Sequence, residues 1–319
     1  MSRPGADGPD LDPSRSHEQG VGPGLLAGDH RGVIAEPQPT IDRAREILRR
    51  AHAVTPSRSL LRLEDTLRKG DASTKQLAGL IEGSPALAAR VLRMANSSFY
   101  APAEPVVSLP RAVPMLGHTV LRQLVLATLV LSRQETGRST RQGVAAARLT
   151  GNAVRSAVVS RALAAKSRAC PADDAFSGGL LHDLGHVYLL DDTGDPYATY
   201  LVDEAPDDPL ARELELTGTT HQDVGLAFAY DWNLPPALAT VLREHHHPQP
   251  NTLSAVVSAA DTLVAEVHYP SAEGPEAALA ASDAALGAVG MGRDEWEAMA
   301  PQVRADYAEL LTVFERFGS

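Results

Sequence analysis

The chain has 319 residues, a length that fits one large domain or two small ones, and a net charge of −11. Hydrophobic residues make up 44% of it, which excludes a wholly disordered protein, and the single cysteine, Cys170, excludes a disulfide framework and a cysteine-based zinc cage. The longest apolar stretch, 121–131, is too short to span a bilayer and the first residues lack the apolar segment of a signal peptide, so we expect a cytoplasmic protein without a membrane partner.

The first predicted elements follow a segment without apolar periodicity. Residues 1–39 contain 7 Gly and 6 Pro, and we expect them to form a disordered leader. Apolar residues then recur on one face of a helix over residues 40–51. Two further helix starts are marked by a capping-box spacing at Ser73–Gln76 and by an N-cap followed by proline at Ser84-Pro85.

The middle of the chain predicts long apolar helices and one interruption. Helices are expected over 119–132, which is apolar on every side, over 146–166, and as one continuous helix over 176–190. Residues 191–215 break the pattern with 9 acidic side chains, one basic side chain and prolines at 196, 206 and 209. This composition indicates a loop that holds at most a short helix.

Helical patterns resume toward the carboxyl end. They cover about 221–231, 236–246 and 253–267, followed by an Ala-rich, weakly patterned segment at 271–290. The last helix is expected to begin at Pro301, because proline is tolerated in a first turn but not in a helix interior. Since no alternating β-pattern exceeds four residues, the sequence predicts an all-α fold.

Charge is distributed unevenly along the chain. Residues 40–168 carry 21 basic and 8 acidic side chains, whereas residues 169–319 carry 5 and 26. Such polarity predicts halves that attract each other, or a basic half that meets an acidic partner. Uneven decoration of helix surfaces would give the same pattern.

Several histidines and carboxylates occupy positions that suit a metal site. They lie at the ends or on the apolar faces of predicted helices: His182, Asp183, His221, His245, His246 and Asp261. A carboxylate on an apolar helix costs several kcal/mol unless it is paired or bound to a cation. Imidazoles together with carboxylates suit Zn, Mn or Fe.

The pair His182-Asp183 allows two interpretations. Adjacent helical residues are about 100° apart, so both side chains can reach one cation at the helix edge. Alternatively the pair caps or bridges neighbouring helices, which spacing alone favours. His186 adds an i, i+4 histidine to His182, a weak signal without a third ligand.

Four segments of the sequence together resemble the HDOD domain, a bacterial, signalling-associated branch of the HD phosphohydrolase superfamily. They are IEGSPALAARVLRMANSSFY, VSLPRAVPMLGHTVLRQLVL, FSGGLLHDLGHVYLL, and GTTHQDVGLAFAYDWNLP with the later REHH. The resemblance covers roughly residues 55–265 and implies an HD-like fold of two packed helical lobes. It places an HDOD domain at 40–270, with lobes at about 40–135 and 136–270, and a helical extension packed on it at 271–319.

Active relatives such as the HD-GYP phosphodiesterases imply a ligand set for this chain. They use an early histidine, then HD, a lone histidine, a histidine pair and a late aspartate. The resemblance matches all but the first of these to His182, Asp183, His221, His245, His246 and Asp261. The early histidine falls where the chain reads Arg155-Ser156, a glutamate of some relatives corresponds to Gly151, and HPQPN replaces the GYP signature.

The substitution at Arg155 decides between two states of the site. A guanidinium is always charged and has no lone pair for a metal. Placed among His182, Asp183 and Asp261, it would repel a divalent ion and neutralise the carboxylates, leaving a degenerate site without a cofactor. The alternative keeps one divalent Fe, Mn or Zn ion on the remaining ligands, with Arg155 or His186 binding a phosphate.

Three functions follow from these readings. The leading hypothesis is a non-catalytic signalling module that acts through regulatory proteins of a bacterial signalling pathway or through a bound small ligand such as a nucleotide. The first alternative is a metal-dependent phosphohydrolase acting on a nucleotide or cyclic dinucleotide, although the acidic segment 191–215 would oppose an anionic substrate. The second alternative is nucleic-acid binding through the basic N-terminal lobe, which no recognised motif supports.

Overall fold

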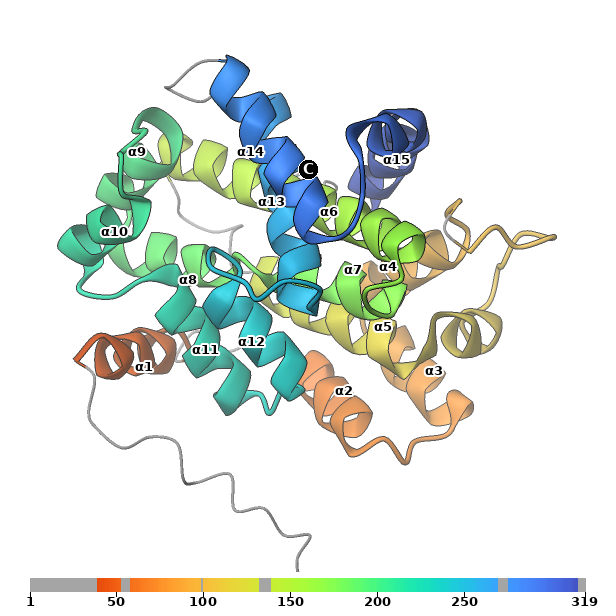
Figure 1. Cartoon of the computed structure of the whole chain (residues 1–319). Coiled ribbons are helices and arrows are strands. Elements are labelled where there is room, and N and C mark those ends of the chain that lie inside the picture. The colour runs from red at the N-terminus through yellow and green to blue at the C-terminus, as the bar shows by residue number, and fades with distance from the viewer. Residues whose placement is uncertain (1–38, 53–57, 99, 132–138, 269–274, 315–319) are drawn as a thin grey trace, which may run out of the picture. The chain divides into compact units, whose positions relative to one another are not determined.

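A computed structural model describes residues 39–52, 58–98, 100–131, 139–268 and 275–314 (Figure 1). The predicted leader, apart from Pro39, lies outside the described residues. From residue 38 onward the chain forms one compact unit.

Every regular element in these ranges is an α-helix, which confirms the predicted fold class. In chain order the helices are α1 (Pro39–His52), α2 (Arg58–Lys69), α3 (Thr74–Glu82), α4 (Pro85–Ala95), α5 (Leu109–Leu131), α6 (Thr140–Ser167), α7 (Ala172–Leu181), α8 (Leu184–Thr193), α9 (Asp195–Asp203), α10 (Pro209–Thr217), α11 (His221–Asp231), α12 (Pro236–Glu244), α13 (Leu253–His268), α14 (Pro275–Ala288) and α15 (Arg293–Phe314). Within the described part of the chain, no helix has both the length and the apolar character needed to cross a bilayer.

The local signals at the start of the chain act as predicted. Ser73 and Gln76 form a complete capping box, in which the Gln76 amide donates to Ser73 Oγ at 3.3 Å and the Ser73 amide donates to Gln76 Oε1 at 2.9 Å. Pro85 occupies the first turn of α4. Helix α5 starts ten residues earlier than expected and bends at Gly117, whose φ of 71° is readily adopted only by glycine.

The predicted continuous helix over 176–190 is wrong. Helices α7 and α8 are separated at His182-Asp183, where Asp183 has φ −96° and ψ 13°. The apolar run through this turn concealed the break, because both helices are buried on most sides. The two metal-ligand candidates therefore lie in a helix–helix turn instead of on a helix face.

The prediction of a loop over 191–215 is also wrong, because α9 and α10 occupy most of it. Pro196 and Pro209 lie in the first turns of these helices, where proline costs no hydrogen bond. Asp208 caps α10 by accepting the amide of Ala211 at 3.0 Å. At the carboxyl end α15 begins at Arg293, so Pro301 lies inside that helix and not at its start.

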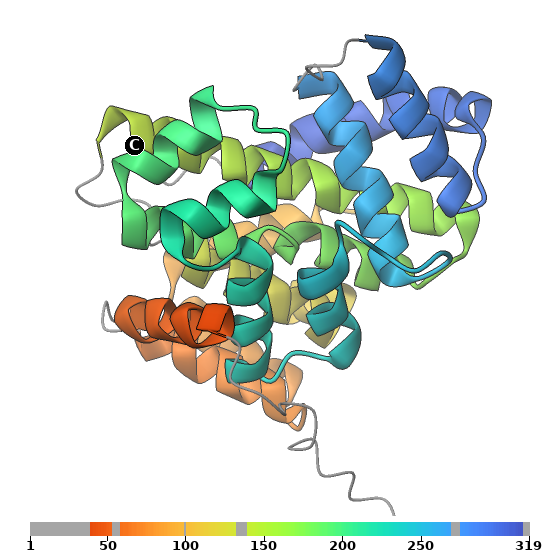
Figure 2. The same ribbon diagram turned by 60° about the vertical axis from the view of Figure 1, so that its left-hand side comes forward.

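Two hydrophobic cores meet along α6. The first core contains side chains of α2–α7 and α13–α15, and the second contains side chains of α1, α8, α9, α11 and α12. Helix α6 contributes Ala145–Leu149 to the second core and Val154–Ala164 to the first. Helix α1, which the sequence assigned to the N-terminal lobe, packs on α11 and α8, while α14 packs on α13 and α15 on α6 and α4 (Figures 1 and 2).

Ion pairs join the basic and acidic segments of the chain, as one reading of its charge distribution predicted. Asp192 binds Arg43 at 2.5 Å and Arg50 at 3.4 Å, and Arg141 binds Asp203. Asp192 and Asp203, two of the nine acidic side chains of residues 191–215, are therefore paired with arginines of the basic segment.

Two glycines allow the helices around the HD turn to approach closely. A Cβ atom at Gly179 would lie 2.4 Å from the carbonyl oxygen of Ser156 on α6, and one at Gly185 would lie 2.0 Å from the carbonyl oxygen of His221 on α11. Side chains at either position would force the helices apart.

Candidate metal centre

The predicted ligands converge where the two cores meet. The turn between α7 and α8, the start of α11, the end of α12 and the middle of α13 bring together His182, Asp183, His221, His245, His246 and Asp261. Together with His186, these residues form three groups. Within each group the ligand atoms lie within 4.8 Å of one another: His221/His245/His246, Asp183/His186/His221 and His182/Asp183/Asp261.

The first group contains three imidazoles with converging Nε2 atoms. His221 Nε2 lies 3.2 Å from His245 Nε2 and 3.1 Å from His246 Nε2. The Nδ1 atoms of His221 and His245 face the Glu213 carboxylate and the Val241 carbonyl oxygen, at 2.8 Å and 3.0 Å. Because these oxygens accept hydrogen bonds, Nδ1 carries the proton and Nε2 keeps its lone pair. Nitrogen ligands bound at about 2.1 Å lie about 3.0–3.4 Å apart around one ion, so this arrangement fits a metal.

The second side of the centre consists of a histidine between two carboxylates. His182 Nε2 lies 3.2 Å from Asp183 Oδ2 and 3.3 Å from Asp261 Oδ1, and Nδ1 lies 2.9 Å from the Gly179 carbonyl oxygen. Burial lowers the pKa of His182, but the charges and hydrogen bonds of Asp183 and Asp261 outweigh burial and raise it well above its ordinary value. In the metal-free protein this imidazole is therefore held in the protonated form, and metal binding there would have to displace a proton.

Asp183 lies between the two sides. Its Oδ2 atom faces His182, whereas its Oδ1 atom lies 3.5 Å from His245 Nε2 and 3.8 Å from His221 Nε2. Burial raises the pKa of Asp183, but the nearby histidines, His182 first, outweigh this and lower it well below its ordinary value. A charged carboxylate is thus available to both groups of ligands.

The contact of α6 with the centre corrects the expectation for Arg155. Asn152 Nδ2 lies 3.2 Å from Asp183 Oδ2 and 3.4 Å from Asp261 Oδ1, so an amide faces the two carboxylates. Arg155 instead places its Cζ atom 4.7 Å from the ring centroid of Tyr307 on α15.

Three buried residues of α9 and α10 were not anticipated from the sequence. Glu213, with no exposed surface, accepts the backbone amide of His221 at 2.8 Å and the Tyr200 hydroxyl at 3.1 Å. Tyr197 Oη lies 2.7 Å from His186 Nδ1. The acidic composition of the segment concealed them, although the spacing of its aromatic residues is that of a helix with one buried face.

Burial keeps most imidazoles of the centre neutral. Desolvation lowers the pKa of His221 to about 3 and of His246 to about 3. Desolvation and the neighbouring His221 lower the pKa of His186 to about 4. Neutral imidazoles at physiological pH are the form that a metal requires.

The predicted phosphate ligand His186 lies inside the cluster. Its ring stacks on His221, with ring centroids 4.1 Å apart, and its Nε2 atom lies 3.8 Å from Asp183 Oδ1. The centre reaches solvent beside these residues through Asp261, whose side chain is 26% exposed, and through the exposed ring of His246.

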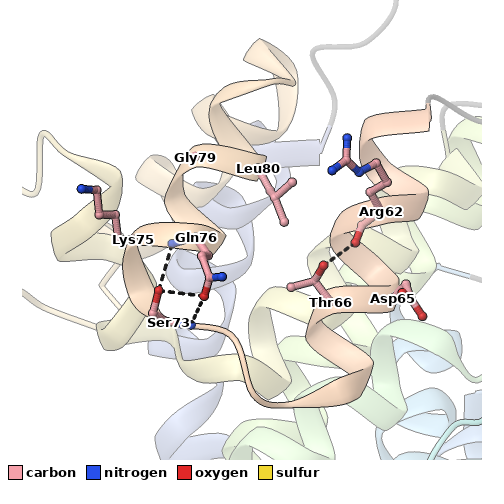
Figure 3. A pocket seen from close by; sticks show the side chains of 8 residues that line it. All are labelled: Arg62, Asp65, Thr66, Ser73, Lys75, Gln76, Gly79 and Leu80. Atoms are coloured by element: carbon pink, nitrogen blue, oxygen red, sulfur yellow. Dashed lines mark hydrogen bonds between the residues drawn. The ribbon is translucent and has the colours of Figure 1, made fainter.

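A groove between α2 and α3 offers a different chemistry (Figure 3). Arg62 and Lys75 line its two walls. Its other polar groups are already used, since Thr66 Oγ1 donates to the Arg62 carbonyl oxygen at 2.7 Å and Ser73 with Gln76 forms the capping box. The groove therefore lacks the free converging groups that the histidine cluster provides.

The comparisons with known proteins agree with this architecture. The model of the HDOD domain family matches residues 54–248. An HDOD domain protein of unknown function from Geobacter sulfurreducens is 21% identical with a TM-score of 0.58, and the match covers 85% of this chain and 98% of that chain. A candidate metal-dependent phosphohydrolase from Shewanella amazonensis SB2B is 15% identical with a TM-score of 0.61, covering 86% of this chain and 100% of that chain.

A third solved structure is a candidate signal transduction protein from Marinobacter aquaeolei VT8, 18% identical with a TM-score of 0.57, where the match covers 86% of this chain and 66% of that chain. At these identities the three structures establish the fold alone. No curated protein matches the sequence. Because the family model spans more than half of the chain, this protein belongs to the HDOD domain family.

Proposed function

We propose that this HDOD protein is a metal-dependent phosphohydrolase that holds one divalent transition metal ion on His221, His245, His246 and Asp183. The observation that carries the proposal is the convergence of three imidazoles, with Nε2 atoms at metal-ligand spacing, beside the Asp183 carboxylate. An ion bound there supplies a Lewis acid for a phosphate oxygen and lowers the pKa of a water molecule.

The protein's own groups have separate tasks in this proposal. Tyr197 donates to His186 Nδ1, which leaves the N–H of His186 Nε2 directed toward Asp183 and the interior of the centre. That N–H can donate to a phosphate oxygen. Asp261, the most exposed carboxylate of the cluster, can orient water on the solvent side.

The acidic segment opposes an anionic substrate less than its composition predicts. Asp192 is paired with two arginines of α1, Asp203 with Arg141, and Glu204 with Arg212 at 2.8 Å. Glu213 is fully buried behind His221. The field that a phosphate ester meets is therefore weaker than the formal charge implies.

The test is metal content together with turnover. Protein produced with Fe, Mn and Zn supplied is expected to contain about one transition metal ion per chain and to hydrolyse bis(p-nitrophenyl) phosphate. His221→Ala should lose both properties. His247→Ala, an exposed histidine next to the pair, is the matched control and should keep both. If the native protein contains no more metal than the buffer blank, the proposal is wrong.

A second candidate function is the non-catalytic signalling module, acting through regulatory proteins or a bound nucleotide. The specific observation in its favour is Asn152, because an amide that donates to Asp183 and Asp261 stands where an additional imidazole would complete a second metal position. This candidate predicts that the native protein binds metal, or a nucleotide, without hydrolysing phosphate esters.

A further inference from the structure

We propose that Glu213 is a positioning residue of the metal centre, which fixes the ring tautomer of His221 so that the Nε2 lone pair faces the other histidines. The inference rests on the proposed metal site. It concerns a residue of α10 that binds no metal itself.

Glu213 contacts His221 on the side away from His245 and His246, and its Oε1 atom also lies 3.7 Å from His186 Nδ1. Both carboxylate oxygens lie within 2.9 Å of His221 Nδ1, and Oε2 also accepts the backbone amide of His221 at 2.8 Å. One side chain thus holds the backbone and the ring of the same residue. Rotation of the ring about its χ angles would break these contacts.

A third donor keeps the carboxylate an acceptor. The hydroxyl of Tyr200 donates to Glu213 Oε1 at 3.1 Å, while the His221 amide occupies Oε2. Burial raises the pKa of Glu213, but the Tyr200 hydroxyl and the His221 amide already donate to its two oxygens. The carboxylate therefore faces the ring as an acceptor, which places the shared proton on His221 Nδ1. His221 Nε2 is then unprotonated, 3.2 Å from His245 Nε2 and 3.1 Å from His246 Nε2.

Capping of α11 does not by itself explain Glu213. The N-cap of this helix is Thr220, whose hydroxyl accepts the amide of Asp223 at 3.2 Å. Glu213 accepts the amide of His221 in addition and reaches the ring. A carboxylate on the second nitrogen of a metal-binding histidine fixes its tautomer, and its loss typically lowers metal affinity about 10–100-fold.

The test measures the tautomer of His221 and the metal affinity in separate experiments. In metal-free protein, ¹⁵N NMR of the imidazole nitrogens should show His221 protonated at Nδ1 in the native chain. In Glu213→Gln one carboxylate oxygen becomes an NH2 group, so the ring loses one of its two acceptors and the fraction of His221 protonated at Nδ1 should fall. Zn²⁺ affinity, measured by competition with a chelator, should fall about 10–100-fold in Glu213→Gln.

Two control variants separate positioning from folding. Thr220→Ala removes a cap of the same helix, and Glu215→Gln alters an exposed carboxylate of α10; both should keep the tautomer and the Zn²⁺ affinity. An Nε2-protonated His221 in native metal-free protein would overturn the inference, even if Glu213→Gln failed to fold. If the native chain binds no Zn²⁺, the proposed function fails, whereas the tautomer measurement still decides the role of Glu213.

Discussion

The side-chain amide of Asn152 lies 3.2 Å from Asp183 Oδ2, across the space between α6 and the turn that joins α7 to α8. An uncharged amide thus lies beside the carboxylates. The resemblance to active relatives had led us to expect the Arg155 guanidinium there, in place of their early histidine. The carboxylates of Asp183 and Asp261 are therefore balanced by His182 and by hydrogen bonds, and the three-histidine side of the centre is left free of a competing cation.

Replacing this amide should change the metal stoichiometry. In Asn152→His an imidazole would join His182, Asp183 and Asp261, and the metal content should rise from about one ion per chain toward two. Asn152→Ala removes the donor without adding a ligand and should keep the single ion. An unchanged metal content in Asn152→His would show that the missing imidazole is not what limits the second position.

Removal of Arg155 should leave the centre intact. The side chain stacks on Tyr307, so Arg155→Ala should lower the free energy of unfolding by about 1 kcal/mol through the lost cation–π contact. Denaturant unfolding measures this loss. Metal content and Zn²⁺ affinity should equal those of the native chain, and a clear change in either would return Arg155 to the site.

The close approach of α8 to α11 should depend on Gly185. A methyl group there meets the carbonyl oxygen of His221 at 2.0 Å, so Gly185→Ala should destabilise the protein by about 1–3 kcal/mol and weaken metal binding. Gly79→Ala in α3 is the matched control, because nothing lies within 4 Å of its Cβ position and its stability should rise slightly. Equal melting temperatures for the two variants would contradict the packing described here.

Acidification should destabilise the metal-free protein. The pKa values of His221, His246 and His186 are lowered by burial to about 3, 3 and 4, below the ordinary histidine value of about 6.5. Between pH 6.5 and 4 the unfolded chain therefore binds more protons than the folded chain, and stability falls as the pH falls. His182 acts in the opposite direction, because its raised pKa stabilises the fold at low pH and this contribution is lost as the pH rises through its folded value.

Melting temperatures of chelator-treated protein at pH 7 and pH 5 measure this balance. Three histidines with lowered pKa values outweigh one with a raised value, so melting should occur at a lower temperature at pH 5. His247→Ala should show the same dependence as the native chain, since His247 is exposed. A higher melting temperature at pH 5 would contradict the neutral state of His221, His246 and His186.

The sequence was sufficient to predict the helical fold and, through the resemblance to HD enzymes, a set of residues that the structure brings close together. His182, Asp183, His221, His245 and Asp261 stand at helix ends or on an apolar face, and the structure brings them together. The sequence was insufficient for residues whose role depends on the direction in which the side chain points. Asn152 and Arg155 share one helix and differ by three positions, yet Asn152 faces the carboxylates of Asp183 and Asp261 whereas the Arg155 guanidinium lies over Tyr307 of α15.

The remaining errors share a physical cause. Buried helices on both sides of the HD turn gave one uninterrupted apolar run, so periodicity could not locate the break at Asp183. In the segment before His221, exposed acids outnumber the buried Tyr197, Tyr200 and Glu213, and composition therefore indicated a loop. The spacing of Tyr197 and Tyr200 and the prolines in the first turns of α9 and α10 were local signals of helix, but the acidic composition outweighed them.

The most direct test of the metal centre is anomalous X-ray scattering from crystals of the full chain grown with Zn²⁺. The account predicts a peak at the zinc edge bonded to the Nε2 atoms of His221, His245 and His246, with Asp183 as the fourth protein ligand. Crystals in which these four side chains hold no anomalous scatterer, while zinc occupies other sites, would contradict it.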